Sequence, residues 1–404
     1  MSARVTGLDS LGDDRENLRA FIQDEPTRKV LEQVVADLAI PLCTVHRGGI
    51  KDAVRFLGAN RSPRSLVVDI SQSELPLSDV HELAEVCEPG VTVVAIGEKN
   101  DVGLFRELTR QGVSDYLVRP ISAALVQKAL SVVGESGAPG RQTQRLGRLV
   151  ATIGARGGVG TTMVATSLAW LIANKRRRRV ALVDLDLHFG TVALGLDLDP
   201  GHGLREALDN PTRIDGVFID RITQKYNDTL FVLSAEEALG EHFDGDRDAI
   251  QHLLEQLRSK FHFVIVDLPR HMSPLVHQVI STATDLVTVS DPSLSGMRDT
   301  IRLNQLLPTL NASCKSINVL NKVGAASQGE IGIDDFQKAL GGKVDFVLPF
   351  DPRQLAAAVN GGKAVPQLKS KLGPMLDELS HRLCGGNAAP ARPMWQRLLP
   401  VGRR

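Results

Sequence analysis

Short apolar runs alternate with longer segments of helical periodicity along most of the chain. In the first third, we predict buried strands at the apolar runs 18–23, 65–70, 92–97 and 115–119. We predict helices at the amphipathic segments 28–38, 80–87 and 122–133. Strands that alternate with helices in this way are typical of a parallel sheet covered by helices on its faces.

A second alternating region begins at residue 149. Its apolar runs are continuous stretches of Val, Ile and Leu rather than period-two patterns, as expected for strands that are covered on both faces. We predict strands at 149–154, 179–184, 229–233, 261–267, 286–290, 316–320 and 344–348. The residues between the two regions are rich in Gly, Gln and Arg, which is typical of a linker.

The 404 residues leave room for two or three domains of roughly 100–200 residues each. We predict two α/β domains, both with mostly parallel sheets. The predicted divisions are a flexible leader, a first domain, a linker, a second domain and a basic tail rich in Pro and Arg, over 1–17, 18–134, 135–148, 149–384 and 385–404.

The most informative segment joins the strand at 149–154 to a helix at 163–174. Glycines without a Cβ let consecutive backbone N–H groups turn inward around a polyphosphate, and the helix N-terminus adds its dipole. We predict that these residues bind a nucleotide, with the Thr162 hydroxyl placed for Mg²⁺. The loop is Ala155, Arg156, Gly157, Gly158, Val159, Gly160, Thr161 and Thr162. Thr161 stands where a phosphate-binding loop ordinarily has lysine, so a tight strand–helix turn is the alternative interpretation.

Carboxylates follow two of the later strands. Asp184 and Asp186 come at the end of one strand, where they can orient a water molecule or a metal-bound water near a phosphate. Asp267 ends another apolar strand, as expected for a carboxylate that reaches the metal. We therefore predict Mg²⁺ at Thr162, Asp184 and Asp267, with Asp184 and Asp186 as catalytic candidates.

Two further segments are candidates for contact with a base. Asn321 directly follows a strand and is suited to hydrogen-bond an adenine edge, and Pro349, Phe350 and Asp351 follow the last strand. Carboxyl ends of parallel strands meet at one edge of a sheet, so all these residues predict one site for ATP with Mg²⁺.

These segments resemble the MinD/ParA family of deviant Walker ATPases over residues 148 to about 370. The family's loop carries lysines in the pattern K-G-G-x-G-K-T, and the two lysine positions are Arg156 and Thr161 here. The resemblance implies a homodimer that closes face to face around ATP, with Arg156 reaching the partner's nucleotide as a catalytic arginine finger. Thr161 in place of the second lysine implies slow or absent hydrolysis.

Over residues 18–375 the chain resembles the TadZ/CpaE-like branch of that family, which acts in Tad (Flp) pilus assembly. The resemblance is carried by 156–162, 182–200, 319–324 and 348–365. It implies a cytoplasmic spatial organiser that is recruited to a cell pole, on the inner face of the membrane, and promotes assembly of a pilus or secretion apparatus. It also implies that the first domain is an atypical, flavodoxin-like response-regulator receiver.

The first domain has the acidic residues of a receiver but lacks two of its other groups. Asp24 and Glu25 follow the first strand and Asp69 ends the strand at 65–70, where a phosphoacceptor lies. A receiver also has a lysine and a hydroxyl residue at the positions of Arg119 and Gly97. We therefore favour a docking or dimerisation module with a degenerate pocket over a working phosphoacceptor at Asp69.

Charge and composition narrow the range of partners. Lys and Arg number 47 and so do Asp and Glu, and aromatic residues make up only 4%, which argues against nucleic acid as a partner. No apolar run approaches the roughly 20 residues of a membrane span, and the N-terminus is too polar for a signal peptide. The scattered cysteines indicate thiols rather than a disulfide framework or a zinc site.

Local cationic segments leave alternatives open. We interpret the run 175–179 as a solvated helix end and not as a contact for lipid or DNA, and 393–404 as too short an amphipathic stretch for more than weak membrane contact. The alternatives for the whole chain are a nucleotide-bound scaffold that does not hydrolyse ATP and a ParA-type ATPase that partitions DNA.

Overall fold

The computed structural model describes residues 16–38, 40–134, 146–240, 247–326 and 329–385. It divides the chain into two compact units, Met1–Arg145 and Leu146–Arg404, here called unit 1 and unit 2. Most of the predicted leader and linker, and the tail with its candidate amphipathic stretch, lie outside the described residues. No helix among the described residues is both long and apolar enough to cross a membrane.

Unit 1 contains, within its described residues, a five-stranded parallel sheet in the order β2-β1-β3-β4-β5. This is the doubly wound order of flavodoxin-like domains. The strands are β1 (Leu18–Ile22), β2 (Cys43–Arg47), β3 (Ser65–Asp69), β4 (Thr92–Gly97) and β5 (Val113–Val118). Polar groups that follow these strands therefore gather at one edge of the sheet.

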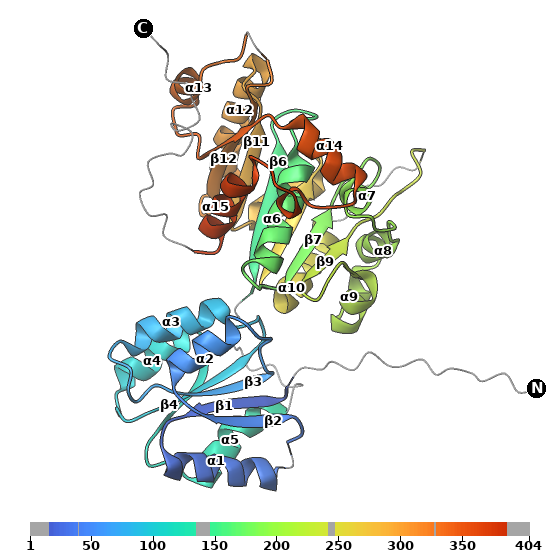
Figure 1. The fold of residues 1–404 in the computed structure, drawn as a ribbon. Coiled ribbons are helices and arrows are strands. Elements are labelled where there is room, and N and C mark those ends of the chain that lie inside the picture. The colour runs from blue at the N-terminus through green and yellow to red at the C-terminus, as the bar shows by residue number, and fades with distance from the viewer. Residues whose placement is uncertain (1–15, 39, 135–145, 241–246, 327–328, 386–404) are drawn as a thin grey trace, which may run out of the picture. The chain divides into compact units, whose positions relative to one another are not determined.

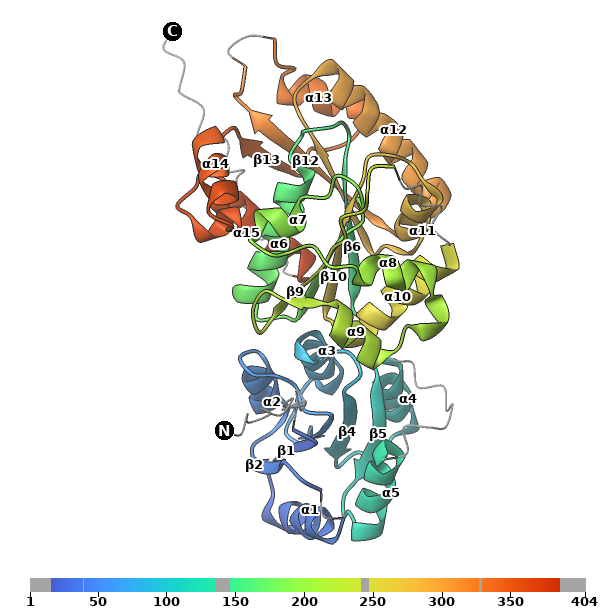
Figure 2. The same cartoon turned by 90° about the vertical axis from the view of Figure 1, so that its right-hand side faces the viewer.

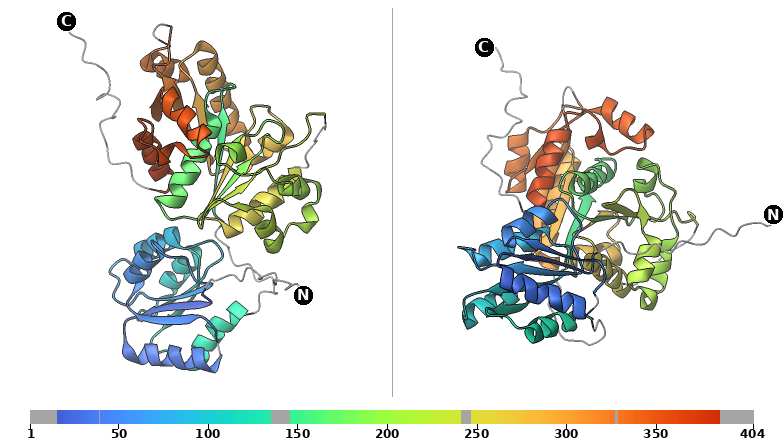
Figure 3. Two further views of the ribbon diagram at one scale, coloured as in Figure 1. Left: turned by 45° about the vertical axis from the view of Figure 1, so that its right-hand side comes forward. Right: turned by 60° about the horizontal axis from the view of Figure 1, so that its bottom comes forward.

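Helices cover both faces of this sheet (Figures 1 and 3). One face carries α1 (Glu25–Asp37) and α5 (Ala123–Gly134), and the other carries α2 (Ile50–Leu57), α3 (Pro76–Val86) and α4 (Val102–Arg110). The apolar pattern predicts the fully buried strands β1 and β3 but misses β2. The reason is that β2 lies at the edge, where its Thr and His side chains are only half-buried.

Unit 2 is built on an eight-stranded sheet in its described part, in the order β13-β12-β11-β6-β10-β7-β9-β8. All neighbouring strands are parallel except β8, which pairs antiparallel with β9 at the edge. This confirms the predicted α/β fold with a mostly parallel sheet. The strands are β6 (Arg148–Gly154), β7 (Val180–Asp184), β8 (Gln224–Lys225), β9 (Leu230–Leu233), β10 (Phe263–Leu268), β11 (Asp285–Ser290), β12 (Lys315–Val323) and β13 (Phe346–Pro349).

Two helical layers enclose the sheet of unit 2 (Figure 2). One layer contains α6 (Thr161–Asn174), α7 (Val192–Gly195), α14 (Pro352–Asn360) and α15 (Gly373–Leu383). The other contains α8 (Gly203–Asp209), α9 (Gly216–Ile222), α10 (Arg247–Lys260), α11 (Pro274–Thr282) and α12 (Leu294–Leu310), and α13 (Ile333–Leu340) packs on α12. Apolar side chains at alternate positions of β6 belong to the hydrophobic cores on the two faces of the sheet, as expected of a strand covered on both faces.

Strand β6 marks the point where the chain order of this sheet reverses, because β10 lies on one side of it and β11 on the other. Connections leave this point in opposite directions, so a crevice opens at the carboxyl ends of the strands. The loop that follows β6 leads into α6, whose inner side chains are fully buried between the sheet and α15. The fold thus places the candidate phosphate loop at this crevice.

Several side chains of the cationic run 175–179 contact other residues of unit 2. Arg176 and Lys175 lie 2.9 Å and 3.4 Å from the carboxylate of Asp377 on α15. The guanidinium of Arg179 lies 5.1 Å from the ring centres of both Phe231 and Phe261. These contacts support the interpretation of this run as a helix end and not as a lipid or DNA contact.

Candidate nucleotide-binding site

The loop between β6 and α6 depends on glycine at two positions. Gly158 and Gly160 have φ values of +74° and +93°, which residues with a Cβ rarely adopt. A Cβ on Gly160 would also lie 2.6 Å from the side-chain nitrogen of Asn321. Among the described residues, no heavy atom outside the adjacent residues stands within 4 Å of such an atom on Gly157 or Gly158. The loop is therefore open on the side of its glycines and tightly packed at Gly160.

Two residues at the end of β12 hold the loop by its carbonyl groups. Asn321 is buried and donates its side-chain amide to the carbonyl oxygen of Val159 at 2.7 Å. The ammonium of Lys322 donates to the carbonyl oxygen of Gly158 at 2.6 Å. The C=O and the following N–H of a trans peptide point in opposite directions. Holding these carbonyl groups outward therefore turns the amides of Val159 and Gly160 toward the inside of the loop, where a phosphate would lie.

Sequence reasoning missed this function of Lys322. The signal was present, since a lysine directly follows Asn321 at the end of a predicted strand. The adenine contact of Asn321 remains a prediction, because the structure shows its amide nitrogen bonded to the loop.

Two carboxylates lie side by side beneath the loop. Asp267 on β10 stands in register with Asp184 on β7, and the two residues are 5% and 2% exposed. The hydroxyl of Thr152 on β6 donates to Asp267 at 3.2 Å. Burial and then the charge of Asp184 raise the pKa of Asp267 to about 7, although hydrogen bonds from Thr162 and Thr152 oppose this shift.

Asp184 also shapes the loop that follows β7. Its carboxylate accepts from the amides of Asp186 at 3.2 Å and Val192 at 3.0 Å. A Cβ on Gly190 would lie 2.5 Å from the same carboxylate. Burial raises the pKa of Asp184 to about 6. Asp186 turns its own carboxylate into the loop, where it accepts from the amide of Phe189 at 3.0 Å.

The oxygen donors at this point fit Mg²⁺ as it is bound with a nucleotide. The described residues hold no cluster of three or more His, Cys, Asp or Glu side chains that would cage a metal alone. Magnesium in nucleotide sites is typically held by one or two carboxylates together with the phosphates. The hydroxyl of Thr162 and the carboxylates of Asp267 and Asp184 supply such a partial set.

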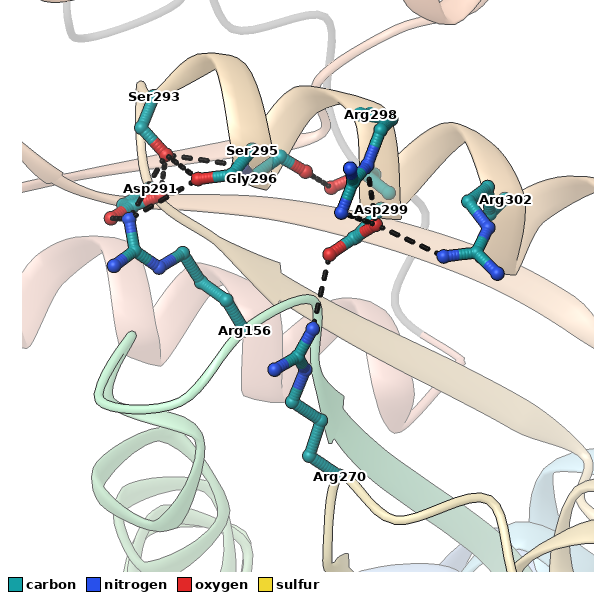
Figure 4. A network of polar contacts seen from close by, with 10 residues as sticks. Arg156, Arg270, Asp291, Ser293, Ser295, Gly296, Arg298, Asp299 and Arg302 are labelled. Carbon is teal, nitrogen blue, oxygen red and sulfur yellow. Dashed lines mark hydrogen bonds and ion pairs between the residues drawn. The ribbon is translucent and has the colours of Figure 1, made fainter.

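Arg156 lies away from its own loop. Its guanidinium contacts Asp291 at 3.4 Å and Ser293 at 3.4 Å between β11 and α12, and Ser295 at 3.3 Å in the first turn of α12 (Figure 4). The side chain is 42% exposed. Thr161, at the other lysine position, directs its hydroxyl toward Gly154, where a Cβ would lie 2.5 Å from its oxygen. Neither position therefore places a cation over the loop that carries it.

The residues predicted near the base lie beside the end of β12. The amide of Phe350 donates to the carbonyl oxygen of Val323 at 2.9 Å, directly after Pro349 ends β13, and its side chain is partly exposed. Asp351 caps α14: its carboxylate accepts from the amide of Gln354 at 3.4 Å. The contact of Phe350 with a base remains a prediction, whereas the carboxylate of Asp351 already caps its own helix.

A cluster of arginines on the same side as Arg156 was not anticipated from the sequence. Asp299 on α12 is 6% exposed, and Arg270, Arg298 and Arg302 lie 3.1 Å, 2.9 Å and 3.4 Å from its carboxylate (Figure 4). Hydrogen bonds from Arg298 contribute most to lowering the pKa of Asp299. The signal in the sequence is the spacing of Arg298 and Arg302, which puts them one turn apart on a helix.

The candidate pocket of unit 1 is occupied by a side chain of the same unit. Arg119 forms ion pairs with both Asp24 and Asp69. The structure does not bring Glu25 into this group, because Glu25 starts α1, is half exposed and pairs with Arg28 at 2.7 Å. Asp24, Asp69 and Arg119 of the predicted pocket therefore meet, and Glu25 points elsewhere.

Sequence comparisons show similarity to a protein family and to several curated proteins. A protein-family profile described as "Cellulose biosynthesis protein BcsQ" matches residues 148–327. The septum site-determining protein MinD of Synechocystis sp. is 24% identical over 250 residues, which cover 59% of this chain and 90% of that protein. An uncharacterized ATP-binding protein of Methanocaldococcus jannaschii is 25% identical over 206 residues, 50% of this chain and 75% of that protein.

Solved structures show the same fold. A ParA family ATPase from Chlorobium tepidum superposes with a TM-score of 0.54 and 20% identity, over 59% of this chain and 100% of that chain. MinD from Pyrococcus horikoshii, solved with Mg-ADP, gives a TM-score of 0.50 and 19% identity, over 59% and 96%. A putative CpaE2 pilus assembly protein from Sinorhizobium meliloti is 33% identical over 29% of this chain and 98% of that chain, with a TM-score of 0.28, which is too low to show a common fold.

Proposed function

We propose that residues 148–327, which match the profile described as "Cellulose biosynthesis protein BcsQ", form a P-loop ATPase domain of the BcsQ, MinD and ParA kind, and that the chain is a nucleotide-dependent organiser. In this proposal, ATP with Mg²⁺ binds at the crevice beside β6 and closes two copies of the chain face to face. The closed dimer then recruits partner proteins, and hydrolysis is slow or absent.

Each part of the crevice has a role in this proposal. The backbone amides of residues 155–162 bind the phosphates. Thr162 and Asp267 hold Mg²⁺, with Asp184 beside them, and Mg²⁺ supplies positive charge at the phosphates when it is bound. Asp184 and Asp186 orient the attacking water in any hydrolysis. Phe350, with Pro349 and Asn321 nearby, lies at the end of the sheet where the base would be received.

The position of Arg156 is the observation that carries this proposal. A triphosphate brings several negative charges to a loop that has a neutral hydroxyl at Thr161. The guanidinium of Arg156 is partly exposed and lies toward α12 rather than over its own loop. A second copy facing the crevice would bring its own Arg156 to the phosphates, and guanidinium groups bind phosphate oxygens in a planar, two-pronged geometry.

We further propose that the apparatus served is a Tad (Flp) pilus or a related secretion assembly at a cell pole. This step rests on the resemblance of residues 156–162, 182–200, 319–324 and 348–365 to TadZ/CpaE-like proteins. The site of action is the cytoplasm, at the inner face of the membrane. Unit 1, with its flavodoxin-like strand order, serves as a receiver-derived module for docking or dimerisation.

A scaffold that binds ATP without hydrolysing it is the second candidate. Thr161 favours it, since a neutral hydroxyl cannot supply the charge that a loop lysine gives to the transferred phosphoryl group. Both candidate functions include the ATP-bound dimer, and they differ only in whether ATP is hydrolysed.

Light scattering of the full chain with and without Mg-ATP tests the proposal. We expect the wild type to double in mass with Mg-ATP and Arg156→Ala to remain monomeric. Arg213→Ala is the matched control, because Arg213 is an exposed arginine of unit 2 that pairs with Glu206 at 3.4 Å. A wild type that neither binds ATP nor changes mass would refute the ATP-dependent dimer. Strong stimulation of ATP hydrolysis by DNA would favour the alternative of a DNA-partitioning ATPase.

A further inference from the structure

The acidic pocket of unit 1 is closed by the unit's own arginine. Asp24 follows β1, Asp69 ends β3, Glu98 follows β4 and Arg119 follows β5, so the parallel sheet brings all of them to one edge. Arg119 forms ion pairs with Asp24 and Asp69 and lies 3.5 Å from the carboxylate of Glu98. One guanidinium thus serves carboxylates from three other strand ends.

Both carboxylate oxygens of Asp69 accept hydrogen bonds. Its side chain is fully buried. One oxygen accepts from the amide of Ser71 at 3.0 Å, and the other accepts from the amide of Gln23 at 3.1 Å and from Arg119. A phosphoryl donor would have to displace Arg119 to reach the second oxygen.

Asp24 is held in a similar way. It is the N-cap of α1 and accepts from the amide of Thr27 at 2.9 Å. Burial alone would raise the pKa of Asp24, but the hydrogen bonds from Thr27 and the charge of Arg119 lower it below its usual value. Asp24 is therefore an ionised carboxylate with a permanent cationic neighbour.

The neighbouring strand end cannot receive a hydroxyl side chain in this arrangement. A Cβ on Gly97 would lie 2.4 Å from the phenolic oxygen and 2.8 Å from a ring carbon of Tyr116. The Tyr116 hydroxyl donates to the carbonyl oxygen of Lys99 at 2.9 Å, and this bond fixes the ring against Gly97. The hydroxyl group that the receiver resemblance implies is thus excluded by packing as well as absent from the sequence.

The divalent cation that the receiver resemblance implies does not fit this pocket. Its carboxylates are already paired with a guanidinium, which a metal ion would have to displace. We propose that Arg119 is a built-in cation that takes the place of a metal ion in unit 1. Unit 1 is held in a single state by this contact, independently of divalent metal and of phosphorylation at Asp69. This inference does not depend on the nucleotide site of unit 2.

Counting bound Mn²⁺ by electron paramagnetic resonance on the nucleotide-free full chain tests this proposal. We expect the wild type and Asp69→Asn to bind the same number of ions. We expect Arg119→Ala to bind about one more ion per chain than the wild type, because the carboxylates of Asp24 and Asp69 lose their partner, and Arg119→Ala with Asp69→Asn to lose it again. Arg110→Ala is the control, since Arg110 is an exposed arginine of unit 1 that pairs with Glu107 at 3.2 Å.

Two outcomes of this count would overturn the proposal. One is a Mn²⁺ ion on the wild type that Asp69→Asn removes, and the other is a folded Arg119→Ala that binds no more Mn²⁺ than the wild type. If Arg119→Ala fails to fold, phosphoryl labelling of the wild type tests the proposal instead. With acetyl phosphate and Mg²⁺ we expect no phosphoryl group on the peptide that contains Asp69, in a reaction where a competent receiver is labelled. Labelling that Asp69→Asn abolishes would contradict the built-in cation.

Discussion

Asp267 lies directly opposite Asp184 on the neighbouring parallel strand, with both carboxyl groups buried beneath the phosphate loop. Because the two carboxyl groups are neighbours and are shielded from water, the state in which both are ionised is disfavoured. The pKa values are accordingly raised, to about 7 for Asp267 and about 6 for Asp184. A cation at this point would stabilise the ionised pair, and Mg²⁺ bound with ATP supplies one in the proposed function.

The nucleotide-free protein should lose stability as the pH rises from about 4 to about 7. A carboxyl group whose pKa is higher in the folded state than its unfolded value of 3.8 favours folding while it is protonated. That contribution is complete below the unfolded pKa and is lost as the pH passes through the folded pKa. For Asp267, the difference between the unfolded pKa of 3.8 and the folded pKa of about 7 corresponds to a loss on the order of 4 kcal/mol.

Urea unfolding in EDTA at pH 5 and pH 7.5, followed by the fluorescence of Trp170 on α6, measures this loss. Asp267→Asn removes the titrating group, so we expect the variant to gain stability relative to the wild type as the pH rises. Comparing the two proteins at each pH cancels the titration of the other groups. An unchanged difference between pH 5 and pH 7.5 would show that Asp267 is ionised throughout.

The carboxylate pair was partly predictable from the sequence. Each aspartate follows an apolar strand, and parallel strands bring such residues to one edge. Their direct pairing was not predictable, because it depends on β10 lying between β6 and β7, and strand order is not encoded in any local pattern. The same limit explains Arg119, whose buried partner Asp69 lies 50 positions away along the chain.

Lys322 should contribute to nucleotide affinity without touching the nucleotide. Its hydrogen bond to Gly158 orients the loop, and a bond from a charged donor contributes about 1.5–3 kcal/mol. We therefore expect Lys322→Ala to weaken binding of a fluorescent ATP analogue by about tenfold or more. Lys338→Ala is the control, because Lys338 is exposed and pairs with Asp335 on its own helix. Equal affinities of the two variants would show that the loop holds its shape unaided.

The glycines of the loop should differ sharply in their tolerance of alanine. Gly160→Ala meets both a positive φ and the side chain of Asn321, and we expect a loss of about 1–3 kcal/mol in stability together with loss of ATP binding. Gly157→Ala is the matched control, since it has open space and no positive φ. Thermal unfolding and ATP binding of both variants check this difference, and similar losses at both positions would contradict the loop geometry.

The sequence shows the glycine pattern of the loop, but it does not show which contact requires glycine at each position. The composition of the loop predicts a phosphate site, whereas the close approach to Gly160 is made by Asn321, which lies 161 residues later on another strand. The edge strand β2 and the arginines around Asp299 were missed for a similar reason. Half-buried positions carry a weak apolar signal, and partners such as Arg270 and Asp299 are joined by the fold rather than by spacing.

Exchange of Arg156 between two copies of the chain is tested most directly by mixing two defective variants. Arg156→Ala keeps an intact metal and phosphate site, and Asp267→Asn keeps the arginine. We expect each variant alone to remain monomeric with Mg-ATP, and their equimolar mixture to recover a dimer in light scattering, because one composite site is then complete. A mixture that stays monomeric, while the wild type dimerises under the same conditions, would show that Arg156 acts within its own subunit.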